Sequence, residues 1–188
     1  MPNLAKIAIL FSGRGSNAIN LVKAINEPDF PSERPIVITD NFDKIDLIPG
    51  QKIYYAPDET AIIGFLQIFA ADLLCLAGYT SILSKSFLDE YPAVMNIHPS
   101  LLPKHKGLNP HQKVLDAGEN MTGATLHIVT PEVDSGRILA SVKVPVEPGD
   151  TAKSLGERVL KAEHFMYPRV LKQYIEIVEE KNNERNSE

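Results

Sequence analysis

The sequence predicts an α/β fold built on a doubly wound, mostly parallel sheet, and three observations support this. Short apolar runs recur through the first 100 residues, and such runs are typical of strands buried on both faces of a parallel sheet. Segments with apolar residues at helical spacing separate these runs. After residue 120 two further runs follow one another without a helix between them. The alternation predicts parallel strands joined by helices, and the last pair predicts an antiparallel extension of the same sheet.

Five parallel strands are predicted in the first half of the chain, at Ile7–Phe11, Pro35–Thr39, Lys52–Tyr55, Leu73–Ala77 and Ala93–Ile97. Three helices are predicted at residues 18–26, 59–70 and 84–89, and the antiparallel pair at residues 124–129 and 138–144. A long C-terminal helix follows from Thr151 to about Glu180, because apolar residues recur there every three or four positions. Pro168 lies inside this pattern and predicts a kink.

Length and composition predict one globular domain over residues 1–180 and a disordered polar tail over residues 181–188. The net charge of -5 and the lack of a basic stripe argue against a nucleic-acid partner. No segment reaches the ~20 apolar residues of a membrane span, and the N-terminus lacks the pattern of a signal peptide. Cys75 is the only cysteine, so no disulfide can form within the chain. These features predict a cytoplasmic protein with no membrane partner.

A glycine-rich turn separates the first predicted strand from the first helix, and it contains Gly13, Arg14, Gly15, Ser16 and Asn17. Glycine lets the backbone approach a ligand closely, and a helix N-terminus offers unpaired N–H groups to an anion. The turn lacks the lysine-serine pair of a Walker motif, but Ala18 and Asp40 leave a dinucleotide site open. The sequence therefore favours a phosphate-binding turn over a purely structural one.

An amide and an imidazole, those of Asn96 and His98, follow the apolar run of the fifth strand. Residues i and i+2 of a strand point to the same face, so both side chains should project together. They lie at the carboxyl end of the strand, where open α/β sheets bind ligands. An amide that can hold an oxyanion, beside a base that can move a proton, is suited to acyl transfer.

Several motifs, in this order and at these intervals, make the chain similar to the folate-dependent formyltransferases, in particular to those that act on glycinamide ribonucleotide. They are the glycine turn, Leu76-Ala77-Gly78-Tyr79, residues 96–104, Gly107-Leu108, His111, residues 123–127 and Asp134-Ser135-Gly136. The resemblance implies a Rossmann-like formyltransferase fold. It also implies transfer of the formyl group of 10-formyltetrahydrofolate, a cosubstrate, to the amine of glycinamide ribonucleotide in de novo purine biosynthesis.

The resemblance assigns the catalytic roles to Asn96, His98 and Asp134. Asn96 is expected to bond the formyl oxygen and the oxyanion that forms from it. His98 is expected to stabilise the same oxyanion and to manage protons. Asp134 is expected to lie across the cleft, near His98, and to help move a proton from the attacking amine to the folate nitrogen. A carboxylate beside an imidazole favours the charged imidazolium, which would strengthen the contact with the oxyanion.

The resemblance also implies two binding regions. The glycine turn would hold the nucleotide phosphate, Glu163 would contact the ribose, and His111 would support the site. The pterin pocket would be formed by Tyr79, Ile82, Leu83, Leu88, Val94, Glu132 and Val133. The expected partners are small molecules, with the chain acting as a monomer or a homodimer. No residues have metal-ligand spacing, so no metal is expected. The resemblance further implies a cis Leu102–Pro103 bond.

Three departures from the family pattern bear on the folate side. Thr80 and Ser81 replace a methionine and an arginine that lies along the folate site. Ser135 and Arg137 replace a glycine and a proline in the folate loop. The segment from residue 40 to residue 57 is short and is expected to lack a helix between the second and third strands. None of these changes affects a catalytic residue.

Other functions stay open on the sequence alone. A formyltetrahydrofolate deformylase shares the catalytic trio and passes the formyl group to water, although such enzymes usually carry an N-terminal regulatory domain. A non-catalytic folate or nucleotide binder would account for the altered folate side. A nicotinamide-dependent oxidoreductase would account for the glycine turn but not for the later motifs. Formylation of methionyl-tRNA is not expected, because those relatives add a C-terminal barrel for tRNA and this chain is acidic.

Overall fold

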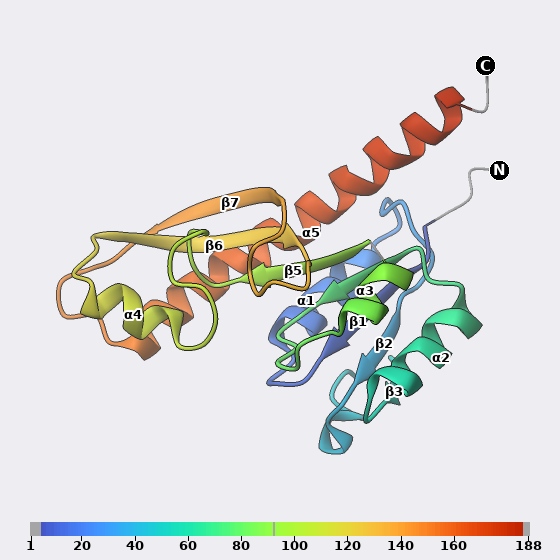
Figure 1. Ribbon diagram of the computed structural model, residues 1–188, viewed down its shortest axis with the longest axis horizontal. Helices are drawn as coiled ribbons and strands as arrows, with labels where there is room; N and C mark the ends of the chain where they lie inside the picture. The colour runs from blue at the N-terminus through green and yellow to red at the C-terminus, as the bar shows by residue number, and fades with distance from the viewer. Residues whose placement is uncertain (1–4, 92, 186–188) are drawn as a thin grey trace.

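The structure, a computed structural model, describes residues 5–91 and 93–185, with side chains of the last helix described as far as residue 181. One seven-stranded sheet runs through it in the order β3-β2-β1-β4-β5-β6-β7 (Figure 1). The strands are β1 (Ile7–Phe11), β2 (Ile36–Thr39), β3 (Ile53–Tyr55), β4 (Leu73–Leu76), β5 (Val94–His98), β6 (Met121–Ile128) and β7 (Ile138–Pro145). The first five pair in parallel, and the last two add antiparallel pairs. The predicted mixed sheet is confirmed.

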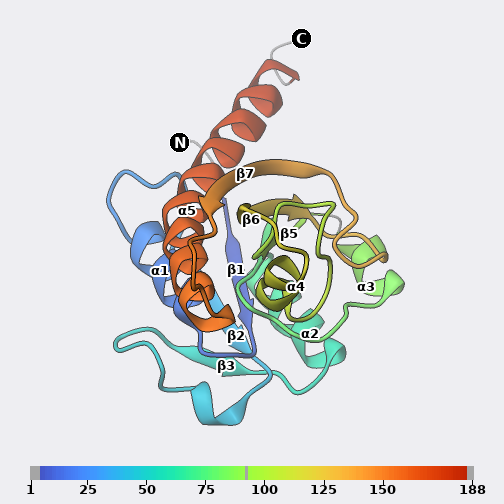
Figure 2. The same cartoon turned by 90° about the vertical axis from the view of Figure 1, so that its left-hand side faces the viewer.

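Helices cover both faces of the sheet, as a doubly wound fold requires. They are α1 (Ser16–Ile25), α2 (Glu59–Phe69), α3 (Lys85–Glu90), α4 (Pro110–Asp116) and α5 (Ala152–Arg185). Helices α1 and α5 lie on one face, and α2 and α3 lie on the other (Figure 2). No described helix is both long and apolar enough to pass through a membrane.

Strand β1 is the centre of the core, and its residues divide between the two faces. Ile7, Ile9 and Phe11 are fully buried with α1 and α5, whereas Ala8 and Leu10 are buried with α2 and α3. A strand with helices on both sides must be apolar at every position, which explains its unbroken apolar sequence. Its carboxyl end therefore lies at a rigid edge of the molecule.

Most predicted elements have the expected positions, with ends that match or differ by at most three residues. Helix α4 was not predicted. It begins at Pro110, directly after Asn109, and proline at the first helical position is a common helix start. The neighbouring prolines and glycine of residues 99–110 hide that signal among turn residues. The expected absence of a helix in residues 40–57 agrees with the single 3-10 turn found there, η1 (Phe42–Lys44).

The C-terminal helix α5 is longer than the sequence predicted. It is continuous through Pro168 and ends at Arg185, so the predicted irregular structure of residues 181–185 is wrong. Lysine, glutamate and arginine are good helix formers, and a helix that is already formed extends without a nucleation cost. Residues 186–188 of the predicted tail lie outside the described residues.

The pairing of β5 with β6 decides which side chains meet at the carboxyl edge. The two strands are antiparallel, with Asn96 opposite His127 and His98 opposite Thr125. Buried Thr125 holds the chain that leaves β5, because its hydroxyl donates to Ser100 O at 2.7 Å and accepts from Leu102 N at 3.1 Å. The following Leu102–Pro103 bond is cis, as expected.

Candidate active site

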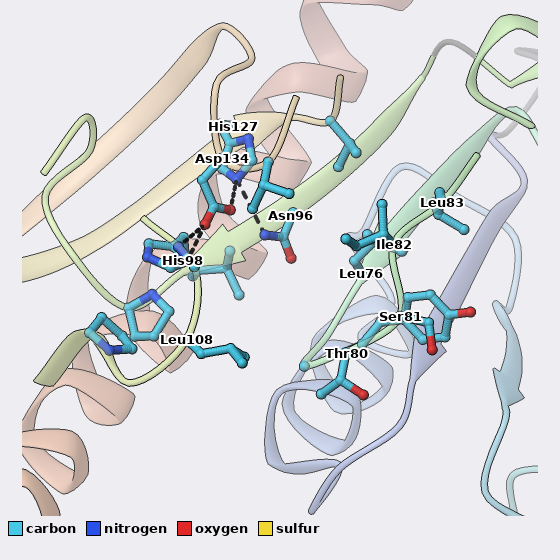
Figure 3. A pocket seen from close by; sticks show the side chains of 18 of the residues that line it. Leu76, Thr80, Ser81, Ile82, Leu83, Asn96, His98, Leu108, His127 and Asp134 are labelled. Atoms are coloured by element: carbon cyan, nitrogen blue, oxygen red, sulfur yellow. Dashed lines mark hydrogen bonds and ion pairs between the residues drawn. The ribbon is translucent and has the colours of Figure 1, made fainter. Parts of the chain in front are cut away.

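Two cavities open at the carboxyl edge of the sheet. The first, the histidine cavity, has a volume of about 340 Å³ and contains Asn96, His98, His127 and Asp134 on one wall (Figure 3). Its opposite wall is formed by the segment from Gly78 to Leu83 after β4. Asn96 and His98 both line the cavity, so the sequence prediction that alternation along β5 brings them together is confirmed.

His127 orients the amide of Asn96. The ring Nδ1 donates to the carbonyl of Ile128 at 2.9 Å, so Nε2 of the neutral ring is an acceptor. Asn96 Nδ2 lies 3.2 Å from that Nε2 and donates to it. The second N–H of the amide remains available for a ligand. The sequence alone assigned no role to His127, which only the register of β5 against β6 reveals.

Asp134 joins the two histidines. Its Oδ2 lies 3.1 Å from His98 Nδ1 and accepts the backbone N–H of Gly107 at 2.8 Å. Its Oδ1 lies 3.5 Å from His127 Nε2. Asp134 has a φ of 50°, a left-handed conformation that few residues other than glycine adopt. These contacts fix a strained residue beside the predicted partner His98, 36 positions away along the chain.

The proton balance of this group is set by burial and by its neighbours. Burial lowers the pKa of His98, and the His105 carbonyl and the Asp134 carboxylate oppose that shift without reversing it. Asp134 thus raises the His98 pKa, as expected, although the effect of burial is larger. Burial raises the pKa of Asp134, yet the Gly107 N–H that it accepts and the neighbouring His98 outweigh burial and lower it. Asp134 is therefore ionised, and His98 releases its second proton easily.

His98 Nε2 is occupied in this structure. It lies 3.0 Å from the carbonyl of His105, which can only accept, so Nε2 carries a proton and Nδ1 faces Asp134. A neutral ring would then place an unprotonated Nδ1 against a carboxylate. A proton between His98 and Asp134 removes that repulsion. The pair can accordingly hold or release one proton, which is what a group that relays protons must do.

The second cavity, the glycine-turn cavity, has a volume of about 330 Å³. It is lined by all the residues predicted to hold the nucleotide, namely Gly13, Arg14, Gly15, Ser16, Asn17 and Glu163, and by His111. Gly15 precedes α1 with a φ of 73°, in the left-handed region, and a Cβ there would meet the side chains of Leu47 and Phe11. Only glycine therefore fits where the turn enters the helix. The first N–H groups of α1 lack partners within the helix and are suited to an anion.

A buried polar pair forms the floor of the glycine-turn cavity. Asn17 Nδ2 donates to Glu163 Oε2 at 2.7 Å, and Glu163 is only 5% exposed. Burial raises the pKa of Glu163 to about 7, although the bond from Asn17 opposes the shift. Asn17 Oδ1 and His111 Nδ1 are buried and have no partner among the described residues. Unpaired buried groups on a cavity wall are suited to a polar ligand such as a sugar.

Helix α5 accommodates the His111 ring through a glycine. A Cβ on Gly156 would lie 3.0 Å from His111 Cδ2. Both residues line the glycine-turn cavity. A larger residue at position 156 would push the ring toward the cavity, which explains a glycine inside a long helix despite its cost.

The two cavities share a wall made of Gly78 and Pro99. The carbonyl of Gly78 accepts from Ser12 N at 3.2 Å and from Gly13 N at 3.3 Å, so the loop after β4 is tied to the glycine turn. Asn96 and His98 precede Pro99 in the chain. The two cavities therefore adjoin each other beside Asn96 and His98.

Only some of the residues predicted to form the pterin pocket line the histidine cavity. Tyr79, Ile82, Leu83 and Val133 line the histidine cavity. Leu88 on α3 and Val94 on β5 do not line it, and both are buried in the core between the sheet and helices α2 and α3. Glu132 is exposed and does not line it either. An apolar pattern predicts burial, but it does not distinguish a residue that faces the core from one that faces a cavity. Within the described ranges, no three His, Cys, Asp or Glu residues are placed to hold a metal ion.

Comparison with known proteins gives consistent results. The family model described as formyl transferase matches residues 5–171. The chain is 36% identical over 187 residues to phosphoribosylglycinamide formyltransferase of Haemophilus influenzae, covering 92% of this chain and 88% of that protein. It is 42% identical over 184 residues to the trifunctional purine biosynthetic protein adenosine-3 of Bos taurus. That match covers 90% of this chain but only 18% of the trifunctional protein, so the chain spans less than a fifth of its length.

Solved structures agree with the sequence matches. The crystal structure of phosphoribosylglycinamide formyltransferase from Anaplasma phagocytophilum superposes with a TM-score of 0.85 at 38% identity, covering 91% of this chain and 86% of that one. A formyltetrahydrofolate deformylase from Pseudomonas syringae also gives a TM-score of 0.85, at 25% identity, covering 93% of this chain and 62% of that one. The fold is thus common to both activities. The family model, which matches most of the chain, and the relative from Haemophilus influenzae show that the chain belongs to the formyl transferase family.

Proposed function

We propose that this chain transfers the formyl group of 10-formyltetrahydrofolate to the amino group of glycinamide ribonucleotide, a step of de novo purine biosynthesis. One observation carries the proposal. A cavity with an amide, an imidazole and a carboxylate on one wall adjoins a second cavity suited to a sugar phosphate, and they meet at Gly78 and Pro99. The formyl donor occupies the histidine cavity, and the ribonucleotide occupies the glycine-turn cavity.

The chemistry is an acyl transfer through a tetrahedral intermediate. The substrate amine attacks the formyl carbon, and the carbonyl oxygen becomes an oxyanion. The free N–H of Asn96 Nδ2 donates to that oxygen, and His98 donates once Nε2 gives up its bond to the His105 carbonyl. The carbon–nitrogen bond to the folate then breaks, leaving the formyl group on the amine.

Asp134 and His98 together carry out the proton transfer. The attacking amine must lose a proton, and the folate nitrogen must gain one as it leaves. Asp134 is ionised and lies 3.1 Å from His98 Nδ1, so the pair takes up the first proton and returns one to the leaving nitrogen. No oxidant, reductant or metal enters the balance.

The nucleotide half of the proposal distinguishes the transferase from a deformylase. A deformylase needs only water as acceptor, so it has no use for a glycine turn, a buried Glu163 and an unpartnered His111 Nδ1 around a second cavity. A non-catalytic binder has no use for a strained Asp134 held against two histidines. Both alternatives therefore leave one half of the site without a purpose.

The test mixes the protein with 10-formyltetrahydrofolate, with and without glycinamide ribonucleotide, and follows the release of tetrahydrofolate. Release that requires the ribonucleotide supports the proposal. Release without it indicates a deformylase, and binding of both compounds without turnover indicates a binder. Asn96→Ala should lower kcat by about 10²–10³. Asn26→Ala is the matched control, because Asn26 is exposed at the end of α1 and lines neither cavity.

The proposal extends to the setting of the enzyme. Residues 1–180 act as a single formyltransferase domain, as a monomer or homodimer, on small molecules alone and in the cytoplasm. The acidic balance and the single, buried Cys75 support this setting.

A further inference from the structure

The ring of His98 is held by His105, a residue that lines neither cavity. Nε2 of His98 lies 3.0 Å from the backbone carbonyl of His105, which can only accept a hydrogen bond. His105 has a φ of 54°, a left-handed conformation that is strained for a residue with a side chain. Such a conformation persists only where the surroundings hold it, so the position of this carbonyl requires an anchor.

The side chain of Glu119 supplies this anchor from outside both cavities. Its Oε1 lies 3.0 Å from His105 Nε2, and because a carboxylate only accepts, that ring nitrogen donates. The side chains of His105 and Glu119 are 15% and 24% exposed, whereas Lys104, 3.1 Å from the same oxygen, is 64% exposed. The bonds from His105 and Lys104 lower the pKa of Glu119, so its carboxyl is ionised at neutral pH. An exposed lysine contributes little to such a pair, and the contact with His105 is therefore the one that orders the chain.

The position of Glu119 is fixed by the end of helix α4. Gly118 has a φ of 64° and donates its N–H to the Leu115 carbonyl at 3.0 Å. The N–H of Glu119 donates to the Val114 carbonyl at 3.3 Å, which completes the bond pattern of a Schellman helix end. Val114 is fully buried in the core. The carboxylate of Glu119 therefore extends from a rigid part of the molecule.

The His105 carbonyl decides which nitrogen of His98 carries the proton. The other ring nitrogen, Nδ1, lies 3.1 Å from the ionised carboxylate of Asp134. Without the carbonyl, a neutral ring would place its single proton on Nδ1, where Asp134 accepts it, and Nε2 would become an acceptor. The carbonyl opposes this arrangement, since it can bond only to a protonated Nε2. It therefore keeps a hydrogen-bond donor on the nitrogen that is to bind the oxyanion.

Resting on the proposed function, we infer that Glu119 and His105 are positioning residues of the formyl transfer. Glu119 holds the ring of His105, and the His105 carbonyl holds His98 with a proton on Nε2. Neither positioning residue touches a substrate, because neither lines a cavity. When the formyl donor binds, its carbonyl oxygen replaces the His105 carbonyl as the acceptor of that proton. One acceptor replaces another, so His98 is already in the form that stabilises the oxyanion.

Steady-state kinetics with both substrates give the first test. Glu119→Ala should lower kcat about three- to tenfold, the effect of one hydrogen bond, with both KM values within about twofold of those of the wild type. Glu119→Gln should recover most of the loss, because its amide oxygen can accept from His105 Nε2. Lys104→Ala is the matched control, since it removes the other partner of the carboxylate and leaves the His105 contact in place. A fall in Lys104→Ala as large as in Glu119→Ala, or no recovery in Glu119→Gln, counts against the inference.

His105→Gly breaks the same contact from its other side. Glycine adopts a φ of 54° without strain, so this variant keeps the backbone turn, loses only the ring, and carries the test alone should Glu119→Ala fail to fold. Its kcat should fall as far as that of Glu119→Ala. The double variant should fall no further, because both changes remove one and the same interaction. Full activity in His105→Gly, or losses that add in the double variant, would overturn the inference.

Nitrogen-15 NMR of the histidine rings gives a second test that needs no turnover. In the wild type the neutral His98 ring should carry its proton on Nε2, and in Glu119→Ala and His105→Gly it should carry the proton on Nδ1. The His98 pKa should also fall in both variants, since the carbonyl opposes the lowering of that pKa by burial. Both variants leave unchanged the other titratable or charged groups that face His98, namely Asp134, His127, His111 and Lys113.

The two tests separate this inference from the proposed function. A His98 proton that moves to Nδ1 in both variants, with no turnover by the wild type, would overturn the proposed function and leave the positioning of His98 standing. Turnover by the wild type, with the proton on Nε2 in all three proteins, would do the reverse. A wild-type ring protonated on Nδ1, together with no turnover, would overturn both.

Discussion

The two cavities solve the problem of binding in different ways. The glycine-turn cavity is lined by helix N-terminal groups, charged side chains and buried polar atoms that lack partners. The histidine cavity is mostly apolar. Its polar side chains, those of Asn96, His98, His127 and Asp134, already contact one another along one wall. The first is built to recognise a ligand, and the second to enclose one and react with it. Changes in the first should therefore act on affinity, and changes in the second on rate.

The largest effect on kcat is expected at Asp134, in the histidine cavity. Asp134→Asn keeps the shape of the side chain and removes its negative charge, so it should lower kcat by about 10²–10⁴. The KM for the ribonucleotide should stay within about twofold of that of the wild type, since Asp134 does not line the glycine-turn cavity. Steady-state kinetics measure both values, and Asp46→Asn, at an exposed position, is the control. A large rise in that KM would break the division between the cavities.

A smaller effect is expected at His127, which acts through Asn96. His127→Ala leaves the amide of Asn96 without its partner, so kcat should fall about three- to tenfold, the worth of one neutral hydrogen bond. His127→Asn should recover part of the loss if its amide oxygen reaches Asn96 Nδ2. Equal kcat values for wild type and His127→Ala would show that Asn96 needs no partner.

Glu163 tests the other cavity through pH. Its pKa is about 7 in the folded protein against an ordinary 4.5, so the folded state holds a proton that the unfolded state releases. The stability that this proton supplies is complete below about pH 4.5 and lost as pH rises through 7. Above pH 7 Glu163→Gln should be more stable by roughly 1–3 kcal/mol. Urea unfolding at pH 5 and pH 8 measures this.

One unfolding result would contradict the prediction for Glu163. If the variant and the wild type show the same pH dependence of unfolding, the buried carboxyl does not titrate in this range. The KM for the ribonucleotide should also rise in Glu163→Gln, with kcat nearly unchanged, because Glu163 lines the glycine-turn cavity.

The smallest expected effect is at Gly156. Gly156→Ala must move the His111 ring by a few tenths of an ångström, so the KM for the ribonucleotide should rise about two- to fivefold. Thermal stability should not fall, because alanine is favoured over glycine inside a helix by about 1 kcal/mol. A loss of stability with an unchanged KM would mean that the glycine serves packing rather than the cavity.

The sequence was informative wherever the fold depends on local pattern. The apolar run of β1 predicted a central strand, and the spacing of Asn96 and His98 predicted that they share a cavity. The role of His127 could not be predicted this way, because it depends on register against a strand about 30 residues distant. The prediction that Leu88 and Val94 line the pterin pocket differs from their observed positions for another reason. Apolar character alone does not show whether a side chain faces the core or a cavity.

The carbonyl of Gly78 has a consequence for how the enzyme handles two substrates. It accepts N–H groups from both Ser12 and Gly13, so the loops that contact the two ligands share one anchor. A displacement of the glycine turn therefore also moves the loop after β4, and the reverse holds as well. We therefore expect synergy between the substrates, and thermodynamics requires the enhancement to be the same whichever arrives first.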